Sequence, residues 1–350
     1  MRYGSVCSGI EAATAAWHPL GWDAAFFSEI ENFPRAVLEH HYPEVPLHGD
    51  FTTIGADDYG SIDILVGGTP CQSFSIAGLR KGMDDDRGNL ALEFLKLAQR
   101  KSPTWLVWEN VPGVLSSNGG RDFGAFLGGL VELGYGFAYR VLDAQYFGVA
   151  QRRRRVFVVG YLGDWRRAAA VLFERESLSG HPAPRRETRE EVAACLTRGV
   201  GQRYDFETET LPIAFGAQNS AKQGDSVSKH VTPTLDKSKT PAVAFAQNQT
   251  GEVREGQVFN TLNTNSNASG RNTPLLRDSM TVRRLTPIEC ERLQGFPDNY
   301  TQIPWRNKAA EDCPDGPRYK ALGNSMAVPV MKWIGSRINK YEQESSSKRV

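Results

Sequence analysis

Residues 62–71, IDILVGGTPC, begin as a mostly apolar run and end in two glycines and a Thr-Pro-Cys turn. A short apolar run bounded by glycine and proline is typical of a strand that is buried on both faces of a parallel sheet. We therefore predict a strand that ends in the glycines and presents Cys71 at the carboxyl edge of the sheet.

Strand-like and helix-like segments alternate over residues 1–163. Further strands are predicted at residues 2–6, 23–30, 104–111 and 154–162, and helices at residues 9–17, 33–42, 89–102 and 123–135. This alternation predicts an α/β fold with an open, doubly wound sheet, in which parallel strands are covered by helices on both faces.

The chain changes character beyond residue 163. A helix is predicted at residues 166–178, and residues 212–278 are rich in Asn, Gln, Thr, Ser and Gly. This polar stretch contains a weak repeat, because IAFGAQN (213–219) recurs as VAFAQNQ (243–249), and TPTL (232–235) is echoed by FNTL (259–262). A short duplicated unit of this composition is expected to form a loop-rich, β-containing module that a partner orders.

The pattern becomes regular again from residue 281. TPIECERLQGF (286–296) predicts a helix with Thr286 as N-cap, Pro287 at its first position and Glu289 completing a capping box. Residues 321–341 are predicted as a turn followed by an amphipathic helix, and residues 344–350 as a frayed tail.

Composition places the chain among soluble globular proteins. Its 350 residues are 40% hydrophobic and 23% charged, which suits one large domain with an appendage or two domains. No apolar run approaches a membrane span, and five scattered cysteines argue against a disulfide framework, so we expect a cytoplasmic protein. No CxxC or HxxxH spacing is present, and no metal site is predicted.

The formal net charge of +1 conceals an uneven distribution. Residues 1–145 contain 10 Lys and Arg against 18 Asp and Glu, whereas residues 146–350 contain 31 against 22. The basic excess of the second part fits a polyanionic partner, and it fits scattered solubilising charge equally well.

Cys71 could be a small buried residue or a nucleophile, and cysteine is most often buried and inert. Glu109, however, ends the next predicted strand, and neighbouring strands of a doubly wound sheet carry their ligand-binding residues at their carboxyl ends. A thiol in a Pro-Cys turn beside a strand-end carboxylate favours the nucleophile.

Three other strand ends carry residues suited to a nucleoside cofactor. SVCSGIEA (5–12) is a glycine-bearing turn that lacks the full GxGxxG pattern. Glu29 closes the second strand, where an acidic residue commonly binds a ribose, and Asp50 closes the third. Gly9, Glu29 and Asp50 together favour a nucleoside cofactor.

The basic run QRRRR (151–155) precedes the apolar strand segment VFVVGY (156–161). If strand geometry extends back, Gln151, Arg153 and Arg155 lie on one face, and Arg152 and Arg154 on the other. One set could then act in the site while the other meets phosphates, and the alternative is a basic run that is merely exposed.

Taken in order, these motifs resemble those of the DNA cytosine-5 methyltransferases. The resemblance covers nearly the whole chain and rests on SVCSGIEA, FFSEIE, GDFTTI, DILVGGTPCQSFS, RGNL, WENV, QYFGVAQRRRR, RLTPIECERLQGFP and RYKALGNSMAVPV. The first motif departs from the family's usual Phe-x-Gly-x-Gly-Gly, because Cys7, Glu11 and Ala12 stand where Phe and two Gly are common.

The resemblance implies a Rossmann-like domain that uses S-adenosyl-L-methionine to methylate C5 of a cytosine in double-stranded DNA. The Cys71 thiolate would attack C6 of a base flipped out of the helix, and Glu109 would share a proton with the ring's N3. Arg153 and Arg155 would orient the base and its phosphate.

The expected contacts of cofactor and DNA follow from the same resemblance. The cofactor is expected at Cys7, Gly9, Ile10, Glu11, Glu29, Ile30, Asp50, Phe51, Pro70, Leu90, Asn324 and Met326. DNA is expected at Gln72, Ser73, Gln151, Arg152 and Arg154.

The resemblance also divides the chain. It implies a catalytic domain at residues 1–163, completed by 318–343, a target-recognition domain at 164–282, a hinge at 283–317 and a tail at 344–350. The polar side chains of the recognition domain suit base edges in the major groove, and its repeat is expected to make two related contacts across a short site. We expect a monomer whose partners are double-stranded DNA and a cognate restriction endonuclease.

Four other functions compete with this interpretation. The same chemistry could act on RNA, although a long recognition insert favours DNA. A catalytically silent DNA-binding protein would not need the set of Cys71, Glu109 and Arg153. A nicotinamide oxidoreductase is disfavoured by the incomplete glycine pattern, and amino-group methylation by the lack of an Asp/Asn-Pro-Pro-aromatic loop.

Overall fold

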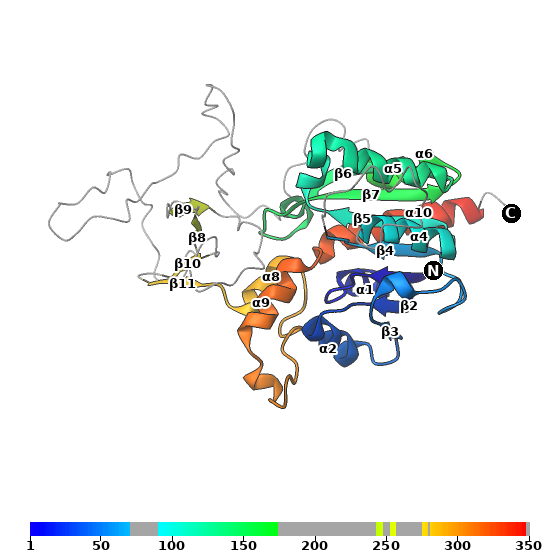
Figure 1. Ribbon diagram of the computed structural model, residues 1–350. Helices are drawn as coiled ribbons and strands as arrows, with labels where there is room; N and C mark the ends of the chain where they lie inside the picture. The colour runs from blue at the N-terminus through cyan, green and yellow to red at the C-terminus, as the bar shows by residue number, and fades with distance from the viewer. Residues whose placement is uncertain (71–89, 174–242, 248–252, 257–274, 279–280, 348–350) are drawn as a thin grey trace, which may run out of the picture.

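The computed structural model describes residues 1–70, 90–173, 243–247, 253–256, 275–278 and 281–347. Three predicted site residues, Cys71, Gln72 and Ser73, lie outside these ranges, as does most of the predicted target-recognition domain. The described part contains a seven-stranded sheet with helices on both faces and a smaller, four-stranded sheet (Figure 1).

The large sheet confirms the predicted doubly wound α/β fold, and its strands follow the order β3-β2-β1-β4-β5-β7-β6. They are β1 (Arg2–Val6), β2 (Asp23–Ser28), β3 (Leu47–His48), β4 (Ile64–Gly67), β5 (Trp105–Asn110), β6 (Tyr135–Asp143) and β7 (Arg154–Leu162). The first five in this order run parallel, whereas β7 is antiparallel to both β5 and β6.

The prediction that all strands are parallel is therefore wrong for β7, because β6 runs in the same direction as the first five strands and β7 runs against it. Only residues 144–153 join these two strands, and a parallel crossover needs about a dozen residues or more. β6 is not among the predicted strands, because it lies at the sheet edge and its side chains are mostly half-buried, without a continuous apolar run.

Alternating side chains of the central strands build two hydrophobic cores, one on each face. In β5, Trp105 and Val107 belong to one core, and Leu106 and Trp108 to the other. The first face is covered by α1 (Ala12–Trp17), α2 (Asn32–His41), α6 (Trp165–Leu172) and α10 (Val328–Ser347). The second face is covered by α4 (Leu90–Lys101) and α5 (Arg121–Glu132). Burial on both faces explains why the central strands are almost continuously apolar.

Helix α6 belongs to the α/β unit, although it falls within residues 164–282. Ala168, Val171 and Leu172 are fully buried in the first core, because these apolar positions share one face of the helix. The main-chain carbonyls of Val171 and Leu172 also accept hydrogen bonds from Arg337 and Arg140. The large sheet with its helices thus extends at least to residue 172.

The C-terminal helices complete the same unit. Helix α8 (Pro287–Gln294) begins with the predicted capping box between Thr286 and Glu289. Residues 321–324, predicted as a turn, are instead the last residues of α9 (Asp315–Asn324). Helix α10 is anchored to α1 and to the sheet by two indole donors, from Trp17 Nε1 of α1 to the Met331 carbonyl (2.8 Å) and from Trp105 Nε1 of β5 to Glu342 Oε1 (3.0 Å).

Helix α10 also continues to Ser347, into the stretch predicted as a frayed tail. An ion pair between Lys340 and Glu344, one turn apart, supports this last part of the helix. Residues 348–350 of the predicted tail lie outside the described ranges.

The smaller sheet lies within the predicted recognition domain and is antiparallel, in the order β11-β10-β8-β9. Its strands are β8 (Val243–Gln247), β9 (Val253–Gly256), β10 (Leu275–Asp278) and β11 (Thr281–Arg284). The second copy of the sequence repeat supplies β8, whereas the first copy, at residues 213–235, lies outside the described residues.

Two kinds of feature are absent from the described ranges. None of their helices combines the length and the apolar character that crossing a bilayer requires. They also contain no group of three or more His, Cys, Asp or Glu side chains placed to hold a metal ion.

Candidate functional site

Among the described residues, predicted site residues from several strands gather at the carboxyl edge of the parallel strands. Because β7 is antiparallel, its first residues lie at the edge where β4 and β5 end, and Glu109 and Asn110 pair with Phe157 and Val156. Arg153 and Arg155 are thereby brought to the end of β5. The same edge carries the turn after β1 and the residues that follow β2.

The carboxylate of Glu109 lies between an arginine and the turn that leads to Cys71. Its Oε1 is 3.0 Å from Arg155 Nε, and both side chains are largely buried. Its Oε2 faces Gly68, where an added Cβ would stand only 3.0 Å from this oxygen and 3.1 Å from Met326 Cε. A side chain at this position would crowd both groups, which favours the second glycine of IDILVGGTPC.

Burial sets the protonation behaviour of this cluster. Glu109 is 8% exposed, and desolvation raises its pKa above the ordinary value even though Arg155 and Arg153 pull it down. Desolvation, together with the charge of Arg155, lowers the pKa of Arg153 to about 9. Glu109 is thus a carboxyl group that takes up a proton readily while staying hydrogen-bonded to a cation.

The residues from 151 to 155 follow the predicted two-residue period only in part, because β7 begins at Arg154. Gln151 and Arg153 are buried, at 0% and 2% exposure, whereas Arg154 is exposed. Arg152 and Arg155 are both half-buried, although the period places them on opposite faces. Exposure therefore separates Gln151 and Arg153 from Arg154, but it does not separate Arg155 from Arg152.

The guanidinium of Arg153 binds main chain. Its Nη2 donates to the carbonyls of Gly323 (3.2 Å) and Ser325 (2.7 Å), in the junction between α9 and α10. Its Nε and Nη1 have no hydrogen-bond partner among the described residues, and neither does the buried amide of Gln151. Buried polar atoms of this kind are normally satisfied, so they mark a place where water or a ligand group is expected.

Gln294, the last residue of α8, holds the same junction from the other side. Its Nε2 donates to the carbonyls of Leu322 (2.6 Å) and Ser325 (3.5 Å), and its side chain is fully buried. Gln294 and Arg153 therefore fix the short turn that carries Asn324 and Met326, although the two residues lie on opposite sides of the recognition segment in the sequence.

The residues that precede Cys71 are fixed by β5. Trp108 Nε1 donates to Thr69 Oγ1 (2.9 Å), and Asn110 Nδ2 donates to the Thr69 carbonyl (2.9 Å). The Asn110 side chain in turn accepts from the Val111 amide (2.8 Å). Adjacent strand ends thus hold Thr69 and Glu109 together before any ligand is bound.

The turn after β1 lies beside Glu29. The Gly9 amide donates to Glu29 Oε2 (2.8 Å), and the Ile30 and Glu31 amides donate to its Oε1 (both 2.8 Å). Burial and the charges of Glu29 and Asp50 raise the pKa of the Cys7 thiol to about 12. This shift shows that Cys7, Glu29 and Asp50 are close together, and that Cys7 is a poor candidate for a thiolate.

The predicted cofactor residues divide into buried and accessible side chains. Ile10, Glu11 and Phe51 are at most 4% exposed, so any contact that they make with a ligand would come from their main chain. Ile30 is 69% exposed, Pro70 and Asn324 are exposed, and Leu90 and Met326 are half-buried. Asp50 caps the turn after β3 by accepting from the Thr52 amide (3.0 Å).

Sequence reasoning did not assign roles to Thr69, Asn110 or Gln294. Asn110 and Gln294 could have been identified from the sequence, because each is a polar residue directly after an apolar strand or helix face, in motifs quoted above. Such a residue needs a hydrogen-bond partner when it is buried. The carbonyls that they bind come from distant parts of the chain, and no spacing in the sequence indicates these partners.

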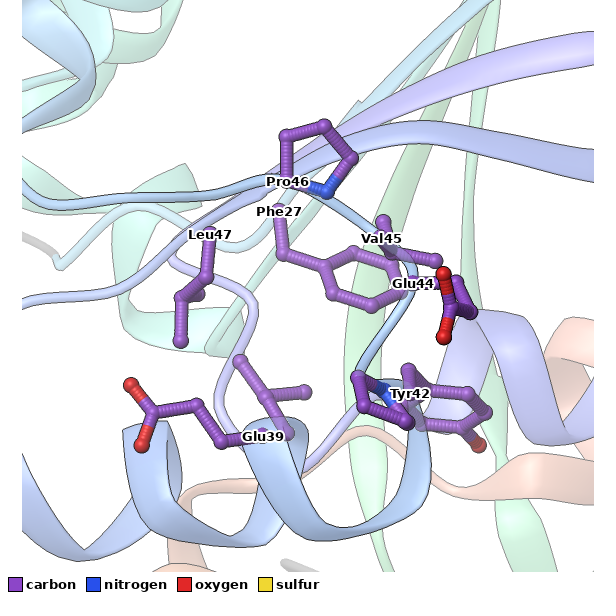
Figure 2. A pocket seen from close by; sticks show the side chains of 9 residues that line it. Phe27, Glu39, Tyr42, Glu44, Val45, Pro46 and Leu47 are labelled. Carbon is purple, nitrogen blue, oxygen red and sulfur yellow. The ribbon is translucent and has the colours of Figure 1, made fainter.

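A hollow of about 380 Å³ lies elsewhere, between α2 and the edge strand β3 (Figure 2). It is lined by Phe27, Leu38, Glu39, Tyr42, Pro43, Glu44, Val45, Pro46 and Leu47. None of these residues belongs to the predicted site.

We expect the Gln294 amide donor to be important for stability. In Gln294→Glu, an ionised carboxylate would face two carbonyl oxygens that need a donor, so the free energy of unfolding should fall by about 2–3 kcal/mol. Gln294→Met, the matched control, removes the donor without adding a charge and should cost about 1 kcal/mol. Urea unfolding of the wild type and the two variants measures these decreases in the free energy of unfolding. Equal decreases in the two variants would contradict this role.

Comparison with known proteins agrees with the motifs. The family model described as C-5 cytosine-specific DNA methylase matches residues 1–340. The DNA N-6-adenine-methyltransferase of Escherichia phage P1 is 38% identical, and the match covers 97% of this chain and 61% of that protein. The Type II methyltransferase M1.ScrFI of Lactococcus lactis subsp. cremoris is 31% identical, with 90% of this chain and 72% of that protein covered.

A solved structure supports the fold. The S. pombe Dnmt2 methyltransferase has a TM-score of 0.59 at 15% identity, with 98% of this chain and 99% of that chain covered. This chain spans less than two thirds of the phage P1 relative, so the activity of that whole protein is not carried over. The family match over almost the entire length confirms the resemblance seen in the motifs, and the chain belongs to the C-5 cytosine-specific DNA methylase family.

Proposed function

We propose that this protein methylates C5 of a cytosine in double-stranded DNA, with Cys71 as nucleophile and Glu109 as the group that shares a proton with the base. The observation that supports this most strongly is the Glu109 carboxyl group, which is buried, paired with Arg155 and placed beside Gly68, three residues before Cys71. A buried carboxyl with a raised pKa suits a group that must hold a proton against a ring nitrogen at neutral pH.

S-adenosyl-L-methionine is the cofactor that methyltransferases of this kind use, and the sheet edge fits it. No atom of the described residues lies within 4 Å of the position that a Cβ would take on Gly9, so there is open space over the turn. Glu29 borders this space, and the neighbouring Ile30 offers an exposed apolar side chain. We propose that Glu29 binds the ribose hydroxyls, that Ile30 packs on the adenine, and that Asn324 and Met326 close the methionine end.

The residues of the chain activate the base. Cytosine C5 is a poor nucleophile, so the Cys71 thiolate first adds to C6, forming an S–C6 bond and breaking the aromaticity of the ring. The displaced electron density is held at N3, where Glu109 shares its proton. The bound cofactor supplies an electrophilic methyl group, which C5 accepts. A base then removes the C5 proton, the S–C6 bond breaks and Cys71 leaves as thiolate.

The two arginines have different parts in this scheme. Arg155 keeps Glu109 oriented through the contact between Nε and Oε1. Arg153 fixes the turn that carries Asn324 and Met326, and its unpaired Nε and Nη1 are available to the base or to a water molecule beside it. The expectation that Arg153 and Arg155 orient the base and its phosphate stays a prediction.

The target base must leave the helix, because C6 is covered in a stacked duplex. Flipping costs a few kcal/mol, which protein–DNA contacts must offset. We propose that the exposed Arg154 contacts phosphate and that the polar region at residues 174–282 reads the sequence. A monomeric state and a cognate restriction endonuclease stay predictions.

Adenine N6 methylation is the second function to consider, because the phage P1 relative is named as an N-6-adenine methyltransferase. The present sequence contains no Pro-Pro pair, and hence no Asp/Asn-Pro-Pro-aromatic loop for an amino-group acceptor. Cytosine C5 is therefore favoured for this chain.

The test is incubation of unmethylated duplex DNA with isotopically labelled S-adenosyl-L-methionine, followed by nucleoside analysis and bisulfite sequencing. We expect 5-methylcytosine at one short sequence, no N6-methyladenine, and no label in an RNA of the same sequence. Label in N6-methyladenine or in RNA would show that the proposed substrate is wrong. Absence of label from every substrate would contradict the methyltransferase function.

A further inference from the structure

We propose that Tyr300 is a positioning residue for the cofactor turn at residues 7–11, which it holds through the Ile10 carbonyl. The inference rests on the proposed function, because it concerns the binding of S-adenosyl-L-methionine. Tyr300 follows α8 and the target-recognition segment in the sequence, whereas Ile10 follows the first strand, so the contact joins two distant parts of the chain.

The turn has an unusual backbone. Cys7, Gly9 and Glu11 all adopt the left-handed region, with φ of 49°, 57° and 59°. Side chains other than glycine disfavour this region, and such residues persist only where surrounding contacts hold them. The shape of the turn therefore depends on contacts made to it from outside.

Residues 8–11 of the turn each have such a contact. The Ser8 amide donates to the Ser28 carbonyl (3.1 Å), and the Gly9 amide donates to Glu29 (2.8 Å). Glu11 accepts from Ser5 and from the Thr14 amide (3.1 Å). The Ile10 carbonyl accepts from the Tyr300 hydroxyl (2.9 Å), and Ile10 is fully buried, so water does not replace this donor. Tyr300 is the one member of this set that comes from beyond the recognition segment.

The Tyr300 ring is itself rigidly held. The ring stacks on His41, with ring centroids 4.1 Å apart and an interplanar angle of 4°. The main-chain carbonyl of Tyr300 lies 2.7 Å from His41 Nε2. Tyr42 contacts its hydroxyl oxygen (3.1 Å). Because the Tyr300 proton is directed to Ile10, Tyr42 must be the donor in that contact. Burial also raises the pKa of Tyr300 far above its ordinary value, so the hydroxyl keeps its proton.

The main chain on both sides of Tyr300 is fixed by a buried ion pair. Glu291 of α8 accepts from the amides of Asn299 (2.7 Å) and Thr301 (2.8 Å), and Arg318 of α9 lies 3.1 Å from the same carboxylate. Glu291 and Arg318 are almost completely buried. The hydroxyl of Tyr300 is thus presented to the turn by a preorganised frame, which is what a positioning residue requires.

Removing one oxygen atom tests the proposal. Tyr300→Phe should weaken binding of S-adenosylhomocysteine by about tenfold, measured by titration calorimetry, since one buried hydrogen bond is lost. The KM for S-adenosyl-L-methionine should rise by about the same factor, while the KM for DNA and kcat change less than twofold. Amide hydrogen exchange in residues 7–11 should accelerate in this variant.

Tyr42→Phe is the matched control, because it removes the neighbouring, half-buried tyrosine hydroxyl but leaves the donor to Ile10 in place. It should change cofactor affinity less than twofold. Should Tyr300→Phe fold poorly, His41→Phe keeps an aromatic ring against Tyr300 and removes the contact of Nε2 with the Tyr300 main-chain carbonyl, and a threefold loss of affinity is expected.

Two outcomes overturn the proposal. Cofactor affinity that is unchanged in Tyr300→Phe, or in His41→Phe where that variant is the one that folds, shows that the turn does not depend on this contact. Equal losses in Tyr300→Phe and Tyr42→Phe show a general packing effect instead. If the wild-type protein binds no S-adenosylhomocysteine, the proposed function itself is contradicted. If the wild type binds it and the variant binds it equally well, only the role of Tyr300 is contradicted.

Discussion

Glu109→Gln is expected to lower kcat by about 10²–10⁴-fold while leaving cofactor binding nearly unchanged. Glutamine keeps the shape of the side chain and can still offer a hydrogen bond, but it cannot share a proton with the ring nitrogen of the base. The loss should appear in single-turnover methyl transfer, which separates chemistry from product release.

The pH dependence gives a second test of the same residue. Desolvation raises the pKa of Glu109, and the protonated form is the one that stabilises the activated ring. Activity that needs this form should therefore fall as the pH rises through the raised pKa, and this descending limb should be missing in Glu109→Gln. A variant with the same pH profile as the wild type, or with kcat reduced less than about fivefold, would contradict the acid role.

Cys71→Ser is expected to abolish turnover, with a loss on the order of 10⁴-fold or more. A serine hydroxyl is almost never ionised at neutral pH and is a far weaker nucleophile toward C6 than a thiolate. DNA binding, measured by fluorescence anisotropy, should change less than threefold, since contacts with phosphates and base edges do not involve this sulfur.

Covalent capture identifies the sulfur directly. A duplex with 5-fluorocytosine at the target lacks the C5 proton that must leave, so the wild-type protein should remain joined to it after methyl transfer. Cys71→Ser should form no such adduct, whereas Cys313→Ser, which changes a cysteine buried near Thr301, should form it normally. An adduct that persists in Cys71→Ser would exclude Cys71 as the nucleophile.

The strands and helices that build the site could be predicted because each has a strong local signal. The apolar runs that end at Gly67 and Asn110 became adjacent parallel strands, and the capping box at Thr286 begins a helix as predicted. The direction of β7 could not be predicted, because it depends on how a short connection folds back. That direction is what brings Arg153 and Arg155 to Glu109.

The sequence predicted which segments of the chain form the site, but not which side chains of those segments are accessible to a ligand. A motif indicates which segment approaches a ligand, but burial decides which atoms of it are accessible. The side chains of Ile10 and Phe51 are buried in the cores, whereas the side chain of Ile30, next to Glu29, is exposed to solvent. Arg153 binds carbonyls more than 170 residues away in the chain, and no local pattern contains that information.

Position 11 shows how tertiary contacts can take the place of backbone freedom at the start of a helix. Glu11 adopts a conformation that costs a side chain about 1–2 kcal/mol, and its own carboxylate caps α1. Glycine would avoid this cost and would lose only a few tenths of a kcal/mol as a cap, so the cap alone offsets little of the strain. The conformation of Glu11 is therefore held by the buried contacts of its carboxylate with Ser5 and Thr14.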